Sequence, residues 1–359
     1  MEDLGLSGTC WRGRRVFLTG HTGFKGGWLT LWLQRLGARV YGYALDPATI
    51  PNLFNVANIA GGLAGETRAD VRDARALCEA MCAAEPEIVL HLAAQPLVRQ
   101  AYADPVATYA INVLGTVHLL EAVRQCPSVR AIVNVTTDKC YENKEWIWGY
   151  RESERLGGVD PYSSSKACAE LVSAAYRESF FRQRALGLAT VRAGNVIGGG
   201  DWASDRLLPD FFRAAQAGVA LEVRHPDATR PWQHVLEPLH GYLILAQQLY
   251  QHGRLFAGAW NFGPRLEDSR KVRELLDCMS RLVPGTAWQS ATGAQPHEAH
   301  TLQLDSSKAR AELSWSPRWS LTQALEQTVR WHEAWRNGAD MHAFSVAQIV
   351  DYERAATRK

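Results

Sequence analysis

The chain has 359 residues, 47% hydrophobic and 21% charged, an ordinary composition for a folded globular protein with a large core. Its 39 basic and 37 acidic residues nearly cancel, which argues against nucleic-acid binding through a general basic field. We predict no membrane span, because no apolar run approaches the required length, and the acidic N-terminus is unlike a secretory signal. Seven scattered cysteines suit reduced thiols, so we expect a cytoplasmic protein.

Short β-branched runs alternate with helical patterns from residue 16 onward. The patterns predict strands at 16–20, 39–45, 64–68, 87–93, 131–136 and 187–193, and helices at 25–37, 72–84, 107–125 and 162–180. This alternation is typical of a parallel sheet covered on both faces, and right-handed crossovers make it a doubly wound, Rossmann-type α/β fold.

The alternation breaks after residue 200, where loop-rich segments precede shorter predicted helices at 237–252, 270–282 and 320–337. We predict a Rossmann-type domain over 14–200, joined by 235–265, and a smaller mixed α/β substrate lobe made of 201–234 and 266–350. Ligands of open α/β sheets bind at the carboxyl ends of the strands, so the cleft should lie there.

A glycine-rich loop follows the first predicted strand, in FLTGHTGFKGGWL (17–29). Gly20 and Gly23 permit a tight turn against a pyrophosphate, and Gly26 lets the next helix start close to the strand. The position between the first strand and the first helix therefore predicts a dinucleotide site. The loop side chains His21, Phe24 and Lys25 belong to the same predicted site.

The adenosine end of this site is less regular. Ala44 stands where an acidic residue should hold the ribose, and Asp46 follows two residues later. No arginine comes directly after the second strand to take a 2′-phosphate, so we favour NAD over NADP and expect it to be held less firmly. Asp46 is equally compatible with a plain loop role before Pro47.

Reactive side chains follow the buried strand at 131–136, in NVTTDKCY (134–141), and again in DPYSSSKACAE (160–170). Tyr162 and Lys166 lie four residues apart, on one face of a helix. A phenol of pKa ~10 becomes a usable base when nearby positive charge favours its phenolate, and Thr137 can bond the same substrate hydroxyl. Tyr-x-x-x-Lys alone is common by chance, but its place downstream of a dinucleotide loop favours catalysis.

Together these residues resemble the extended short-chain dehydrogenase/reductases, from Val16 to about Trp335. The resemblance also rests on HLAAQ (91–95), NVLGT (112–116), RAGNVIGGGD (192–201) and LDSSKA (304–309). Within that family, TGHTGFKGGWL, TTDKCY and RPWQHVLEP are closest to the sugar-nucleotide 4,6-dehydratases that act on CDP-glucose.

The resemblance implies NAD as the cofactor and a dideoxyhexose pathway for bacterial surface polysaccharide (lipopolysaccharide O-antigen). It places Asp70 and Val71 beside the adenine, and the cofactor's ribose and pyrophosphate beside Leu92, Ala93, Ala94 and Gln95. Lys166 would bind the nicotinamide ribose, and Tyr162 would remove the sugar O4 proton. Asp138 matches the acid that protonates the departing C6 hydroxyl.

Lys139 departs from related dehydratases, which have a glutamate there that removes the C5 proton. A lysine with an ordinary pKa of ~10.4 is protonated at pH 7 and cannot be that base. Either burial and nearby positive charge make it a neutral amine, or it stays charged and stabilises the enolate while another group takes the proton. The sequence leaves both open.

For the sugar nucleotide, the resemblance indicates Asn195 and His297, and guanidinium groups suited to a diphosphate come from Arg99, Arg206 and Arg230. HEAH (297–300) lacks metal-site spacing, so we predict no metal. The family usually dimerises through the helices at 107–125 and 162–180, which implies a homodimer or larger homo-oligomer.

Two alternatives stay open: another sugar-nucleotide dehydratase or 4-epimerase of this family, and a non-enzymatic NAD-binding regulatory protein. Asp138 and Lys139 argue against simple epimerisation, which needs no elimination acid. Thr137, Tyr162 and Lys166 argue against a regulatory protein.

Overall fold

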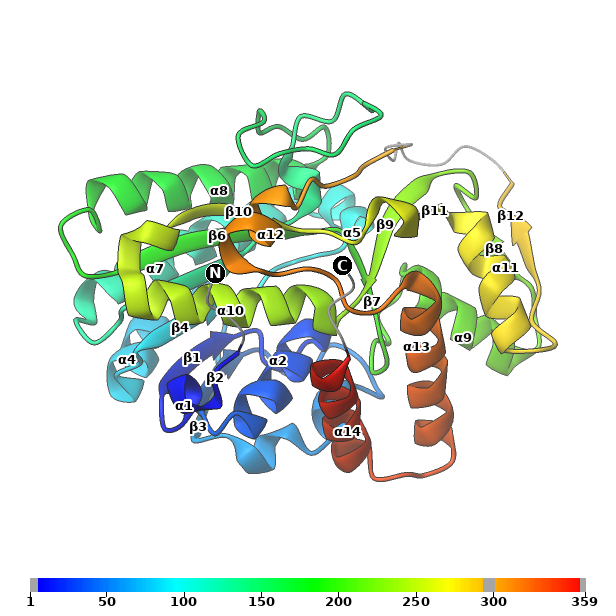
Figure 1. Cartoon of the computed structure of the whole chain (residues 1–359), viewed down its shortest axis with the longest axis horizontal. Helices are drawn as coiled ribbons and strands as arrows, with labels where there is room; N and C mark the ends of the chain where they lie inside the picture. Colours follow the sequence, from blue (N-terminus) through cyan, green and yellow to red (C-terminus); the bar gives the residue numbers. More distant parts are fainter. Residues whose placement is uncertain (1–5, 293–300, 356–359) are drawn as a thin grey trace.

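The computed structural model describes residues 6–292 and 301–355, and it confirms the doubly wound α/β fold (Figure 1). Seven parallel strands form the main sheet in the order β10-β6-β5-β4-β1-β2-β3. Their bounds are β1 Arg15–Thr19, β2 Arg39–Ala44, β3 Gly65–Arg68, β4 Ile88–His91, β5 Ala131–Val135, β6 Gly187–Ala193 and β10 Gly258–Phe262.

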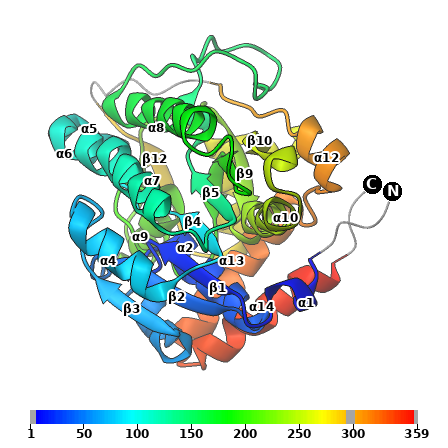
Figure 2. The same ribbon diagram turned by 90° about the vertical axis from the view of Figure 1, so that its left-hand side faces the viewer.

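The neighbouring strands β4, β5 and β6 are buried along their whole length, as expected for strands covered on both faces. One face packs against α2 (Phe24–Arg35) and α10 (Leu236–His252), and the other against α4 (Ala74–Ala84), α7 (Gly115–Gln125) and α8 (Pro161–Ser179). Figure 2 shows these two helical layers on opposite sides of the sheet. Packing between these helices and the sheet places the carboxyl ends of the parallel strands side by side, and ligands of such sheets bind there.

Two small sheets form the second lobe, at the right of Figure 1. One contains β7 (Asn195–Ile197), β9 (Thr229–His234) and β11 (Ser269–Lys271), and the other contains β8 (Leu221–Val223) and β12 (Trp288–Ser290). They share an apolar core with α9 (Leu207–Ala217), α11 (Val272–Leu282) and α13 (Leu321–Arg336).

Several elements differ from the prediction. Within 235–265, where the sequence predicted only a helix, β10 follows α10 and adds an edge strand to the main sheet beside β6. The predicted helix 107–125 is α6 (Pro105–Tyr109), a π-helical turn (Ala110–Leu114) and α7. Further helices that the sequence did not suggest are α1 Gly8–Trp11, α3 Leu53–Val56, α5 Val98–Ala103, α9, α12 Ser307–Leu313 and α14 Met341–Arg354. The division into two domains stays a prediction, since α14 packs against both α2 and α13.

The prediction of no apolar run of membrane-spanning length was wrong. The continuous helical stretch Pro105–Gln125 has 21 residues and contains an 18-residue window with a mean hydropathy of 1.4, which meets that length and composition. In its most apolar window 44% of the residues are buried inside the fold, and α7 packs against α4 and α8. A helix in the core of a globular protein can have the same length and hydropathy, so these two properties are weak evidence that this segment enters a membrane.

Candidate active site

The glycine loop between β1 and α2 leaves no room for side chains at two of its glycines. Gly20 has a φ of +77°, and a Cβ there would lie 2.7 Å from the backbone nitrogen of Ala93. A Cβ on Gly26 would lie 2.0 Å from the carbonyl oxygen of Gly20. The loop therefore turns tightly and brings the start of α2 beside β1, and a helix N-terminus in this position fits a pyrophosphate.

We expect Gly26→Ala to weaken binding of the dinucleotide and to lower stability by about 1–3 kcal/mol, because the clash is with backbone and no side chain can move away. Gly8→Ala is the matched control, since it lies in α1 with no atom within 4 Å of the added carbon. Thermal melting and NAD titration by tryptophan fluorescence would measure both effects. Unaltered binding by Gly26→Ala would contradict this account of the loop.

The adenosine end contains an arginine that the sequence did not place there. Arg68, at the end of β3, pairs in register with Ala44 at the end of β2. Its guanidinium lies 3.5 Å from the highly exposed Asp46 and 2.8 Å from Glu66. The lack of an arginine directly after β2 is therefore a poor guide to the charge at this end of the site.

Three predicted neighbours of the cofactor, His21, Asp70 and Val71, bond to other parts of the protein. The Glu66 carboxylate lies 2.6 Å from Nε2 of His21, whose pKa is lowered by burial although Glu66 opposes the shift. The backbone carbonyl of Asp70 accepts a hydrogen bond from Tyr43, and the carbonyl of Val71 contacts His118 of α7. These contacts are structural, and proximity to the adenine stays a prediction.

The segment HLAAQ connects the phosphate loop to α8. The backbone nitrogens of Leu92 and Ala93 donate to the backbone and the hydroxyl of Thr19 on β1. Asn112 accepts from the backbone of Gln95 at 2.9 Å and donates to Ser165 of α8 at 2.9 Å. Asn112 thereby fixes α8, the helix that bears Tyr162, relative to the HLAAQ segment. Ala94 belongs to the same segment.

The five predicted catalytic residues come together at the strand ends. Thr137, Asp138, Tyr162 and Lys166 are all buried, and Lys139 is partly exposed. The Thr137 hydroxyl donates to the Asp138 carboxylate at 3.0 Å, and the Lys139 ammonium lies 3.6 Å from it. The second carboxylate oxygen of Asp138 is buried with no partner among the described residues. The carboxyl group of Asp138, the ammonium of Lys139 and the phenol of Tyr162 thus lie close together.

Burial dominates the electrostatics of this cluster. It raises the pKa of Tyr162 to about 12, and the charge of Asp138 acts in the same direction while Thr137 and Arg206 oppose it. Burial lowers the pKa of Lys166 to about 8, although Glu170 and Cys140 oppose the shift. The Lys166 ammonium donates to the carbonyl of Val135 at 3.0 Å. The phenol therefore needs additional positive charge before it can act as a base near neutral pH.

A buried ion pair beneath the cluster was not predicted. Arg192 of β6 binds Glu170 of α8 through two hydrogen bonds of 2.8 and 2.9 Å. The hydroxyls of Thr136 and Thr190 also donate to Glu170, and Arg192 donates to the Tyr141 hydroxyl at 2.7 Å. Thr136 and Glu170 are close in sequence to Thr137 and Lys166, so the pair joins the two catalytic segments. The sequence did contain a signal for this pair, because an arginine within the buried strand GLATVRA needs a buried acidic partner.

The predicted substrate residues are distributed over the facing lobe. Arg206 caps α9, bonds Asp201 at 2.8 Å and is close enough to Tyr162 to affect its pKa. Arg230 is buried on β9, and Asn195 on the adjacent β7 has a buried side-chain oxygen with no partner in the described part of the chain. Arg99 instead forms an exposed ion pair with Asp205. His297 lies outside the described residues.

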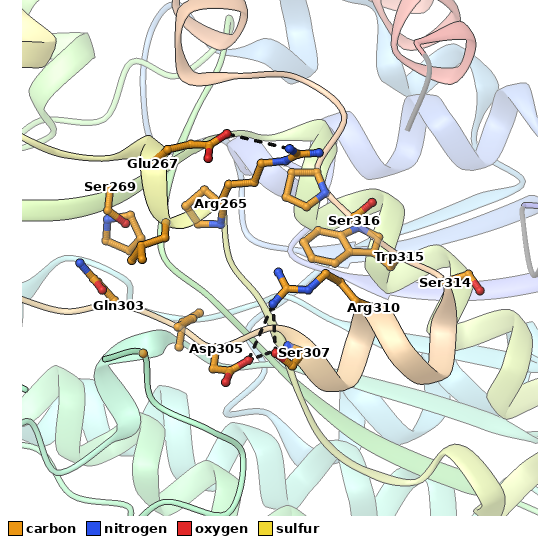
Figure 3. Close-up of a pocket in the computed structure, with 16 residues that line it drawn as sticks. Arg265, Glu267, Ser269, Gln303, Asp305, Ser307, Arg310, Ser314, Trp315 and Ser316 are labelled. Atoms are coloured by element: carbon orange, nitrogen blue, oxygen red, sulfur yellow. Dashed lines mark hydrogen bonds and ion pairs between the residues drawn. The ribbon is translucent and has the colours of Figure 1, made fainter. Parts of the chain in front are cut away.

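A cavity of about 530 Å³ lies outside this cluster (Figure 3). Its two guanidinium groups each face a carboxylate, Arg265 with Glu267 at 3.9 Å and Arg310 with Asp305 at 4.0 Å. None of the predicted site residues lines it. Within residues 6–292 and 301–355 no cluster of three histidine, cysteine or acidic side chains could hold a metal ion.

A dinucleotide loop on β1, a threonine after β5 and a Tyr-x-x-x-Lys pair on α8 define an extended short-chain dehydrogenase/reductase. Residues 17–262 match the GDP-mannose 4,6-dehydratase family, and the chain belongs to this family of sugar-nucleotide enzymes.

Its relatives include 4,6-dehydratases for several nucleotides. CDP-glucose 4,6-dehydratase of Salmonella typhimurium is 53% identical, over 97% of this chain and 98% of the relative. dTDP-glucose 4,6-dehydratase of Xanthomonas campestris is 27% identical, over 89% and 94%. The structure of dTDP-glucose 4,6-dehydratase from Bacillus anthracis in complex with NAD superposes with a TM-score of 0.75, at 21% identity, over 91% of this chain and 99% of the other.

Proposed function

We propose that the protein is an NAD-dependent CDP-glucose 4,6-dehydratase, a hydro-lyase that converts CDP-D-glucose to CDP-4-dehydro-6-deoxy-D-glucose and water. The observation that carries this is the buried acid Asp138, held between Thr137 and Lys139 and facing Tyr162, because simple epimerisation needs no elimination acid. The 53% identity to the Salmonella enzyme supports the CDP-glucose specificity.

Oxidation at C4 begins with the O4 proton. Thr137 and Tyr162 are hydrogen-bonded to each other, so both can contact one sugar hydroxyl, and Tyr162 removes its proton. Lys166 holds the ribose next to the phenol. NAD held by the glycine loop would provide the hydride acceptor for oxidation at C4 and, in its reduced form, the hydride donor for C6. The C4 ketone makes the C5–H acidic enough to be removed.

Elimination then needs a base at C5 and an acid at C6, and we propose that the Asp138–Lys139 ion pair supplies both. Transfer of one proton from the Lys139 ammonium to the Asp138 carboxylate, 3.6 Å away, gives a neutral amine and a neutral acid. The amine takes the C5 proton, and the acid protonates the departing C6 hydroxyl, which leaves as water. Elimination leaves Asp138 ionised and Lys139 protonated. When the hydride is returned to C6, the Lys139 ammonium gives its proton back to C5, and the proton that Tyr162 took from O4 restores the ammonium, so all three groups regain their starting charges.

We expect Lys139→Met to lower the dehydration rate by about 10²–10⁴-fold, the usual contribution of a positioned base. Lys139→Arg is the matched control, because arginine keeps the charge but does not lose its proton. An equally inactive Lys139→Arg would support the neutral amine. A nearly fully active Lys139→Arg, or a Lys139→Met enzyme whose rate still rises on the basic side of the pH profile, would contradict it.

The diphosphate of the substrate would bind to the smaller lobe. Arg206 and Arg230 offer guanidinium groups, and the unpaired oxygen of Asn195 lies on the strand next to Arg230. The identification of the base as cytosine rests on similarity to the Salmonella enzyme. Arg99 and His297 stay predicted contributors to the same site.

A homodimer would bury an apolar surface on α8, which bears Tyr162, and on the helical segments beside it. The exposed large apolar side chains here include Val106 on α6 and Leu114 on the π-helical turn. Leu171 is exposed on α8, and Phe180 is exposed at its end. Exposed large apolar side chains that gather on neighbouring helices are typical of protein interfaces. We propose that two copies associate through these helices, in the cytoplasm, where sugar nucleotides of O-antigen and lipopolysaccharide biosynthesis would be made.

Incubation of the purified protein with CDP-glucose, dTDP-glucose and GDP-mannose, with and without added NAD, would test the proposal by mass spectrometry. We expect loss of one water from CDP-glucose alone, and more product when NAD is added. Dehydration of another nucleotide sugar instead would show that the base is wrong. No dehydration of any substrate, with NAD binding confirmed, would favour the epimerase or regulatory alternatives.

A further inference from the structure

Lys25 of the phosphate loop reaches from the cofactor's pyrophosphate end into the reacting cluster. It is the second residue of α2, whose N-terminus forms the pyrophosphate site. Its ammonium lies 5.7 Å from the ring centroid of Tyr242, a buried residue of α10. It is also close enough to Asp138, Lys166 and Arg206 for their charges to shift its own pKa.

The cluster around Lys25 carries more positive than negative charge. Arg206 is neutralised by Asp201, and Glu170 is neutralised by Arg192. The ammonium groups of Lys25 and Lys139 then share the carboxylate of Asp138, and the Lys166 ammonium donates to the carbonyl of Val135. Asp160 adds a second carboxylate near Tyr162, but it caps α8 and is hydrogen-bonded to Ser163.

The ionisation of Lys25 supports this account. Burial lowers its pKa to about 7, the positive charges of Arg206 and Lys166 act in the same direction, and Asp138 opposes them. A charge that is costly to hold in the free protein responds strongly to any further charge brought beside it. Oxidised nicotinamide is a cation, and reduced nicotinamide is neutral. The two forms of the cofactor should therefore interact differently with this lysine.

We propose that Lys25 biases the site toward the reduced cofactor and thereby favours hydride removal from the sugar C4. The ammonium opposes the positive charge of NAD⁺ but not neutral NADH, so it weakens binding of NAD⁺ relative to NADH. This makes Lys25 a positioning charge for the oxidation step as well as a cofactor contact. The inference rests on NAD being the cofactor under the proposed function.

The affinity ratio of the two cofactor forms tests this directly. NAD⁺ and NADH would be titrated into the full-length protein and into Lys25→Met, Lys25→Arg and Lys144→Met, with quenching of tryptophan fluorescence as the readout. Lys144 contacts Trp146, outside the cluster, so its variant controls for loss of a positive charge. Lys25→Gln replaces the methionine variant if that variant does not fold.

We expect the wild-type protein and Lys144→Met to bind NADH more tightly than NAD⁺. In Lys25→Met the ratio of the two dissociation constants should fall roughly tenfold, the scale of one nearby charge in a partly buried site, while Lys25→Arg should keep it. Equal weakening of both forms, with the ratio unchanged, would show that Lys25 only contacts the pyrophosphate and would overturn the proposal. Failure of the wild-type protein to bind either form would contradict the proposed function itself.

Discussion

Asp138→Asn should dehydrate CDP-glucose about 10²–10⁴-fold more slowly than the wild-type protein, because asparagine cannot protonate the departing C6 hydroxyl. It should still oxidise C4, since Thr137, Tyr162 and Lys166 are untouched. Rapid mixing with substrate would show this as one turnover of reduced-cofactor absorbance that decays slowly. Tyr162→Phe is the control and should lose that absorbance change as well.

The same variant tests whether Asp138 and Lys139 share a proton. If Asp138 must accept the Lys139 proton before the amine can act, Asp138→Asn should also stop exchange at C5. CDP-glucose recovered from D₂O would then contain no deuterium at C5. Deuterium at C5 would contradict the shared proton, although Asp138 would remain the acid at C6. A variant that dehydrates at the wild-type rate would remove Asp138 from the mechanism.

Arg192→Met should lower the free energy of unfolding by about 3–5 kcal/mol, because it leaves the buried carboxylate of Glu170 without its cation. Burial alone would raise the pKa of Glu170, but in the intact protein Arg192 and the hydroxyls of Thr136 and Thr190 hold it below its usual value. Urea unfolding of the wild-type and variant proteins would measure the loss.

This loss should depend on pH. Without Arg192 the folded-state pKa of Glu170 rises above its unfolded value, so the variant is stabilised by protonation and its deficit should shrink as pH falls from about 8 to about 5. Arg192→Met combined with Glu170→Leu should recover part of the stability, since no lone charge is left buried. Arg75→Ala is the control, because its ion pair with Glu79 is exposed and should contribute little to stability. A deficit that is the same at both pH values would contradict the buried-charge explanation.

The positions of strands β1 to β6, the glycine loop and the catalytic pair on α8 could be predicted because each has a local signal. Short runs of β-branched apolar residues mark the strands, and the spacing of four residues places Tyr162 and Lys166 on one helix face. The partners of Arg192 could not be predicted, because Glu170 approaches it only when α8 packs on β6. Arg68 reaches Asp46 for a similar reason, since the register of β3 on β2 brings together residues that are far apart in the sequence.

Lys25 illustrates the limit of the loop motif. The motif predicts which backbone groups surround a pyrophosphate, but not that this side chain extends toward Asp138 and Tyr242. The charge of the reacting cluster depends on four separate segments, the phosphate loop, the end of β5, α8 and the start of α9. Only their packing shows that Lys25 lies near Asp138 and Lys166.

The most direct test of the account follows the hydrogen at C4. CDP-glucose labelled with deuterium at C4 would be converted in ordinary water, and the product would be analysed by mass spectrometry and NMR. We predict that the product lacks one water and carries the deuterium at C6, because the hydride removed from C4 returns within the same active site. Deuterium that remains at C4 with no loss of water, or that is lost to solvent, would contradict the assignment as a 4,6-dehydratase.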